Sequence, residues 1–319
     1  MGECPSKERH LMRGVGIRAV GIFPVPEKTL HALIIPLEGA TEEETRAVMK
    51  AFAKFHANSI EIARKHQSSL ADGSSRFAML REDPFDTDAM RKAFEGTSVF
   101  ETMLKALRGF PGQAENADRL ERHMNKACAG NYLQYFGTLS RFVGNTKLAG
   151  FRLGDCWLNN MMFRDETSED GSKRVAAVKL LDLQVVQYGS TIADLQYFFG
   201  ASVRNEVLSK RRELIRDEYF PELMRVLSLL GSPLPDSGYS FDDFWADFQQ
   251  HSEFCLVSAM FVLPIVMAQA STIPDYDTGE DLSWEAIKNV AKDAVQADCG
   301  RIAARFAHLV GIMVQEQVI

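Results

Sequence analysis

The spacing of apolar and polar positions divides the chain into a short β-rich beginning and a long helical remainder. Residues 14–37 are rich in apolar and β-branched side chains on both sides of a polar turn at 26–29, a pattern that predicts two strands. From residue 41 onward the apolar positions recur at helical spacing. Beyond the first helix, this spacing predicts helices over about 89–107, 115–136, 191–202, 205–230, 241–270 and 284–313.

The first helix has a clear start signal. Thr41 is followed three residues later by Glu44, which is the spacing of a capping box. The apolar face that follows contains Val48, Phe52, Phe55, Ser59, Ile60 and Ala63. His56 lies on the same helix, and we interpret it as a hydrogen-bonded core histidine rather than a catalytic group.

A hairpin carries the polar motifs of the chain. Met161–Arg164 and Ala177–Leu181 are strand candidates, and the residues between them are mostly polar. In an antiparallel pair with residue 164 opposite about 178, residue 160 lies opposite about 182. The pattern therefore predicts that Asn160 and Asp182 meet at the open end of the hairpin.

These two side chains, with Asp155 in the loop that enters the first strand, suggest a specific chemistry. An amide oxygen beside a carboxylate suits a hard cation such as Mg²⁺. A further carboxylate that accepts a proton from a hydroxyl completes the arrangement of a phosphoryl-transfer site. The alternative is structural: Asp155 and Asn160 then satisfy backbone groups of a turn, and Asp182 only ends a strand. Spacing leaves both interpretations open.

Composition narrows the class of protein. The chain is 46% hydrophobic over 319 residues, enough for one large domain or two modest ones. A net charge of −7 without a basic tract argues against a nucleic-acid partner. The five cysteines form no C-x-x-C pair, so we expect neither a zinc site nor a disulfide framework. The longest apolar run, 254–268, contains Pro264 and is too short for a membrane span. With a polar N-terminus unlike a signal peptide, we expect a cytoplasmic protein without a membrane partner.

The order of the motifs resembles a known family. The chain contains 154-GDCWLNNMMF-163, then a polar loop, then 179-KLLDLQ-184, followed by Tyr188-Gly189-Ser190 and Asp194-Leu195. This order resembles the CHK kinase-like family, the ecdysteroid-kinase-like branch of the choline-kinase and aminoglycoside-phosphotransferase group. The resemblance implies an α+β, protein-kinase-like fold, with a large and mainly helical C-lobe that carries a catalytic β-hairpin.

The resemblance also implies roles for single residues. Asp155 corresponds to the catalytic base, and Asn160 and Asp182 correspond to the Mg²⁺ ligands. Asp194 corresponds to a residue that braces the catalytic loop. The segment 34–39 corresponds to the hinge whose backbone binds the adenine of ATP, and the implied contacts are Ile35, Leu37 and Glu38. Aromatic residues of the helical body, Tyr197 and Phe254 among them, are expected to pack the core.

Two departures from the family pattern stand out. The family loop reads C-H-G-D, whereas here Arg152 and Leu153 precede the glycine. Only about 35 residues precede the hinge, which is enough for the last two strands of an N-lobe. We therefore predict a remnant N-lobe hairpin and hinge over 1–39, a C-lobe over 40–319, and no lysine placed to bind the nucleotide phosphates.

Two functions are compatible with these observations. The first is an ATP- and Mg²⁺-dependent kinase that phosphorylates a hydroxyl of a small lipophilic alcohol such as an ecdysteroid. The second is a catalytically inactive relative that binds a ligand or a protein, with self-association through the exposed strand edge of its short N-lobe. A purely structural helical protein does not account for the ordered motifs.

Overall fold

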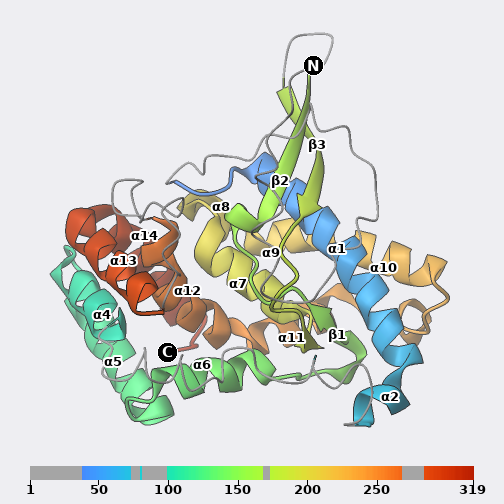
Figure 1. Ribbon diagram of the computed structural model, residues 1–319, viewed down its shortest axis with the longest axis horizontal. Coiled ribbons are helices and arrows are strands. Elements are labelled where there is room, and N and C mark those ends of the chain that lie inside the picture. Colours follow the sequence, from blue (N-terminus) through green and yellow to red (C-terminus); the bar gives the residue numbers. More distant parts are fainter. Residues whose placement is uncertain (1–37, 73–79, 81–98, 168–172, 268–283) are drawn as a thin grey trace, which may run out of the picture.

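A computed structural model describes residues 38–72, 80, 99–167, 173–267 and 284–319. The strands predicted over 14–37, and with them Ile35 and Leu37, lie outside these ranges. Within them the chain is mainly helical and contains two small antiparallel sheets, which confirms the predicted α+β kinase-like class (Figure 1). No helix of the described ranges combines the length and the hydrophobicity of a bilayer span.

Helix α1 (Glu42–Lys65) begins at the predicted capping box. The backbone N–H of Glu44 donates to Oγ1 of Thr41 at 3.2 Å, and the backbone N–H of Thr41 donates to the Glu44 carboxylate at 2.7 Å. The predicted apolar face of α1 is buried, apart from a half-buried Phe55. In Figure 1, α1 crosses one side of the molecule and packs on α10 (Phe220–Leu229) and on strand β1 (Ala149–Arg152).

Two groups of helices lie on either side of α7 (Ile192–Ser202), which is buried along its whole length. On one side α7 faces α1, through the Phe52–Phe198 ring contact, and on the other side it packs on α12 (Ser252–Val266). The helices of the second group lie beyond α12, on its side away from α7 (Figure 1). The remaining helices are α2 (Gln67–Ala71), α4 (Val99–Gly109), α5 (Ala114–Cys128), α6 (Tyr132–Arg141), α8 (Asn205–Ser209), α9 (Arg211–Leu214), α11 (Phe241–Gln250), α13 (Trp284–Ala297) and α14 (Cys299–Gln315).

The prediction of one helix over 115–136 is wrong. The chain turns between α5 and α6, because Ala129 and Gly130 both adopt left-handed backbone, with φ of 47° and 89°. Asn131 then caps α6, its side chain accepting from the backbone N–H of Gln134. The pair Gly130-Asn131 was the available signal, since glycine favours positive φ and asparagine favours the N-cap.

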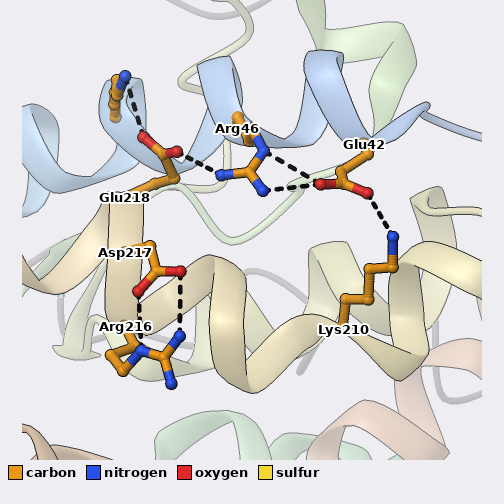
Figure 2. Close-up of polar contacts among 7 residues, drawn as sticks. Glu42, Arg46, Lys210, Arg216, Asp217 and Glu218 are labelled. Atoms are coloured by element: carbon orange, nitrogen blue, oxygen red, sulfur yellow. Dashed lines mark hydrogen bonds and ion pairs between the residues drawn. The ribbon is translucent and has the colours of Figure 1, made fainter.

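The predicted helix over 205–230 is also interrupted. It contains α8, α9 and α10, with a π-helical turn at Ile215–Tyr219 between the last two. An ion-pair network attaches this stretch to α1: Arg46 lies between Glu42 and Glu218, and Glu42 also accepts from Lys210 (Figure 2). In the same way, the predictions over 241–270 and 284–313 each split into two helices, at His251 and at Asp298.

The predicted hairpin is present, with longer strands and a different register. Strand β2 (Met161–Thr167) pairs antiparallel with β3 (Lys173–Leu180), and Arg164 lies opposite Ala177 instead of residue 178. A bulge next to this pair places Asp165 opposite Val175, and a sequence pattern cannot show such an extra residue. At the open end, the backbone N–H of Leu181 donates to the carbonyl of Asn160 at 2.8 Å. Asn160 therefore faces Leu181, and Asp182 is the next residue.

Candidate active site

The site lies in the loop that joins β1 to β2. Strand β1 pairs antiparallel with β4 (Gln187–Ser190), which leads directly into α7. At the end of β1, the buried guanidinium of Arg152 donates to Oγ of Ser140 on α6 and, at 2.7 Å, to Oε1 of Gln187 on β4. Arg152, which stands where the family loop has cysteine, thus anchors the strand that enters the site.

The glycine of the motif is required by the backbone. Gly154 has a φ of 84°, a conformation that side chains disfavour. A Cβ at this position would lie 2.6 Å from the carbonyl oxygen of Val185. The loop can therefore pass this close to the 182–186 segment only with glycine before Asp155.

Asp194 of α7 holds the loop, as predicted. Its carboxylate accepts from the backbone N–H groups of Leu153 at 2.7 Å and Gly154 at 3.0 Å. It also accepts from Nε2 of His56, at 3.0 Å, and both side chains are fully buried. Because a carboxylate only accepts, Nε2 carries a hydrogen, and Nδ1 of the same ring forms a hydrogen bond with the hydroxyl of Tyr219 at 2.8 Å.

The charge of Asp194 is stabilised by these contacts. Burial by itself raises the pKa of a carboxyl group, but the hydrogen bond from His56 and the nearby charge of Arg152 outweigh it. The pKa of Asp194 therefore lies below its usual value. His56 has the structural position expected from the sequence, and it supports the loop between β1 and β2 through Asp194.

Asp155 is held through both of its oxygens. The hydroxyl of Tyr197 donates to Oδ1 at 2.7 Å, and the amide Nδ2 of Asn160 donates to Oδ2 at 3.0 Å. Asn160 Nδ2 also donates to the backbone carbonyl of Asp155. The half-buried carboxylate thus has a defined orientation and is joined directly to the predicted metal ligand.

The environment of Asp155 favours proton uptake. Burial raises the pKa of its carboxyl group, the hydrogen bonds from Tyr197 and Asn160 lower it, and the negative charge of Asp182 raises it again. The net effect is a pKa above the usual value. A carboxylate of raised pKa is a better general base at neutral pH.

Asp182 lies directly after β3 and is exposed to solvent. Its φ of 54° is left-handed, which is uncommon for residues other than glycine, and its Oδ1 accepts from the backbone N–H of Gln184 at 3.2 Å. Such backbone is enriched at functional sites. The sequence placed Asp182 at a strand end but contained no sign of this conformation.

Asn160 and Asp182 could hold a magnesium ion. Because the amide nitrogen of Asn160 is bonded to Asp155, its Oδ1 is the atom left for a cation, and Asp182 adds a carboxylate. These are the oxygen donors that Mg²⁺ prefers, with water and substrate phosphates as its other ligands. The described part of the chain contains no group of three His, Cys, Asp or Glu side chains that could hold a metal by itself.

The end of the predicted hinge docks on the C-terminal end of α7. The backbone N–H of Ala40 donates to the carbonyl of Ser202 at 2.7 Å, and Ala40 forms a parallel bridge with Val203. Gly39 has a φ of 88°, and a Cβ there would lie 2.9 Å from the same carbonyl oxygen. Of the three predicted adenine contacts, only Glu38 is described. Its side chain is exposed and forms an ion pair with Arg204.

Sequence reasoning missed the partners of the site residues. Tyr197 was assigned to core packing, although its hydroxyl contacts Asp155. Its spacing from Asp194 was a usable signal, because residues three apart lie on the same face of a helix. Arg152 and Tyr219 also act through contacts with distant segments, and no local pattern marks them.

The structure combines a helical body with a hairpin that carries Asn160 and Asp182 at its open end and a loop that carries Asp155, an arrangement consistent with a kinase-like fold. The model of the ecdysteroid kinase-like family matches residues 34–232, well over half of the chain. The protein therefore belongs to this family. A comparison with curated proteins found no match.

Proposed function

We propose that the protein is an ATP- and Mg²⁺-dependent phosphotransferase that acts on a hydroxyl group of a small lipophilic alcohol, such as an ecdysteroid. The observation that carries this proposal is the hydrogen-bonded pair of Asp155 and Asn160 at the open end of the hairpin, beside Asp182. Membership of the ecdysteroid kinase-like family supports the reaction class. A cytoplasmic location, where ATP is abundant, is part of the proposal.

In this mechanism Asp155 orients the acceptor alcohol and takes its proton. The alcohol oxygen attacks the γ-phosphorus of ATP, the bond to the bridging oxygen breaks, and ADP leaves. The raised pKa of Asp155 suits proton uptake, and Tyr197 and Asn160 keep its carboxylate in one orientation. Asn160 and Asp182 would hold the Mg²⁺, which neutralises charge on the phosphates when bound. Glu38, with Ile35 and Leu37, belongs to the hinge proposed to bind adenine.

Nucleotide binding gives a first test. Mg²⁺-ATP at 100 times its Kd is expected to stabilise the protein by about 2.7 kcal/mol, which raises its Tm. Asp182→Ala removes the carboxylate proposed to bind Mg²⁺, so this shift should be lost. Asp236→Ala, which removes an exposed carboxylate from a surface turn, should keep it. Differential scanning fluorimetry with and without Mg²⁺ measures the difference.

A second candidate function is a catalytically inactive relative that binds a ligand or a protein. Leu153, which stands where the family loop has histidine, favours this alternative. The absence of any Mg²⁺-ATP shift in the wild-type protein would contradict the kinase proposal and support the second candidate. Light scattering would then test for self-association.

A further inference from the structure

Helix α7 contacts the catalytic loop along its whole length, and the contacts run in the same order on both segments. Asp194 binds the backbone of Leu153 and Gly154. One turn further, Tyr197 binds the side chain of Asp155. At the end of the helix, Oγ of Ser202 accepts from the backbone N–H of Leu158 at 3.2 Å. Side chains from the beginning, the middle and the end of α7 thus bind successive positions of the loop.

Tyr197 differs from the two phenylalanines that follow it in this helix. All residues of α7 are buried, and the next two positions are Phe198 and Phe199. A buried hydroxyl costs free energy unless it is hydrogen-bonded, so phenylalanine would serve core packing equally well at position 197. The hydroxyl of Tyr197 finds its partner in Asp155. Helix α7 also buries the polar side chains of Asp194, Gln196 and Ser202, but it is Tyr197 that contacts the side chain of Asp155.

The Tyr197 hydroxyl can donate this hydrogen bond at neutral pH. Burial raises the pKa of the Tyr197 hydroxyl well above its usual value, and the adjacent charge of Asp155 raises it further. The hydroxyl therefore stays protonated and remains a donor. A carboxylate has about four lone-pair positions, so two are left for an acceptor alcohol after Tyr197 and Asn160 have bound.

We propose that Tyr197 is the positioning residue for the catalytic base, in a loop that lacks the family histidine. Its hydroxyl fixes Oδ1 of Asp155, while Asn160 fixes Oδ2, so that the carboxylate cannot rotate away from the acceptor. This role rests on the proposed phosphotransferase function. Both hydrogen bonds that this role requires are present in the structure.

Tyr197→Phe tests the role, since the change removes one oxygen atom and retains the buried ring. We expect kcat to fall about 10- to 100-fold, because a misplaced base is a poor one, with the KM for ATP within twofold of the wild-type value. In crystal structures, the carboxylate of Asp155 should hold one orientation in the wild type and leave it in Tyr197→Phe, because one of its two side-chain donors is lost.

Tyr239→Phe is the matched control. Its hydroxyl also donates to an aspartate, Asp247 on α11, and this carboxylate accepts in addition from Asn145, which precedes β1 and lies outside the loop that carries Asp155. This variant should leave kcat and the orientation of the Asp155 carboxylate unchanged. If the Asp155 carboxylate keeps its wild-type orientation in crystals of Tyr197→Phe, the proposal is overturned, whether or not the protein is active. If the orientation changes but no alcohol is phosphorylated by the wild type, the positioning contact stands and the phosphotransferase function fails.

Discussion

Asp155→Asn is expected to lower kcat for alcohol phosphorylation by about 10²- to 10⁴-fold, the usual contribution of a general base. Asparagine retains the shape of the side chain, and its amide can accept from Asn160 while it donates to the hydroxyl oxygen of Tyr197, but it cannot take up the proton. Binding of Mg²⁺-ATP should persist, because Asn160 and Asp182 are unchanged. Initial rates on a panel of hydroxylated lipophilic acceptors, steroids included, measure the effect.

The control for this prediction is Asp165→Asn, a change of the same chemistry at an exposed position of β2. It should leave kcat within twofold of the wild-type value. If Asp155→Asn retains wild-type turnover, Asp155 is not the catalytic base. If the wild type phosphorylates none of the acceptors, the result favours the catalytically inactive relative instead.

The same substitution should not destabilise the fold. Because the folded protein raises the pKa of Asp155, the ionised carboxylate costs stability above that pKa, and the cost disappears as the pH falls. At pH 7, Asp155→Asn should therefore unfold at the same temperature as the wild type or higher, as measured by calorimetry. A lower Tm would mean that the carboxylate is stabilised by contacts stronger than those from Tyr197 and Asn160.

Asp194→Ala is expected to cost about 3–5 kcal/mol of unfolding free energy, the usual result of removing one partner of a buried ion pair or hydrogen-bonded pair. The substitution leaves the backbone N–H groups of Leu153 and Gly154, and Nε2 of His56, without their acceptor. Urea unfolding followed by circular dichroism measures the loss. Where the alanine variant does not fold, Asp194→Asn retains one acceptor oxygen and should show a smaller loss.

The pH dependence of this loss has a definite sign. The folded protein lowers the pKa of Asp194, so its stabilising contribution is present above the unfolded carboxyl pKa. This contribution is lost as the pH falls through the lower, folded pKa, and the gap between wild type and Asp194→Ala should narrow in acid. The exposed control Asp236→Ala should stay within about 0.5 kcal/mol of the wild type. A gap that does not change with pH would show that Asp194 acts through shape rather than charge.

Local signals determined much of the fold. The capping box at Thr41 started α1 where it was predicted, and the mostly apolar pattern after residue 191 identified α7. The hairpin was recognised because its strands are apolar and its loop polar. Helix breaks were missed where the signal was a backbone conformation, such as the left-handed Ala129, because apolar spacing continues across such a break.

The candidate site divides in the same way. The sequence by itself predicted that Asp155, Asn160 and Asp182 lie together, because the first two lie in one loop and a hairpin returns the chain to the third. Tertiary structure alone decided what holds them: Tyr197 reaches Asp155 across 42 residues, and His56 reaches Asp194 across 138. Such contacts depend on how α1 and α7 pack, and helical periodicity reports which face of a helix is buried but not which side chain it meets.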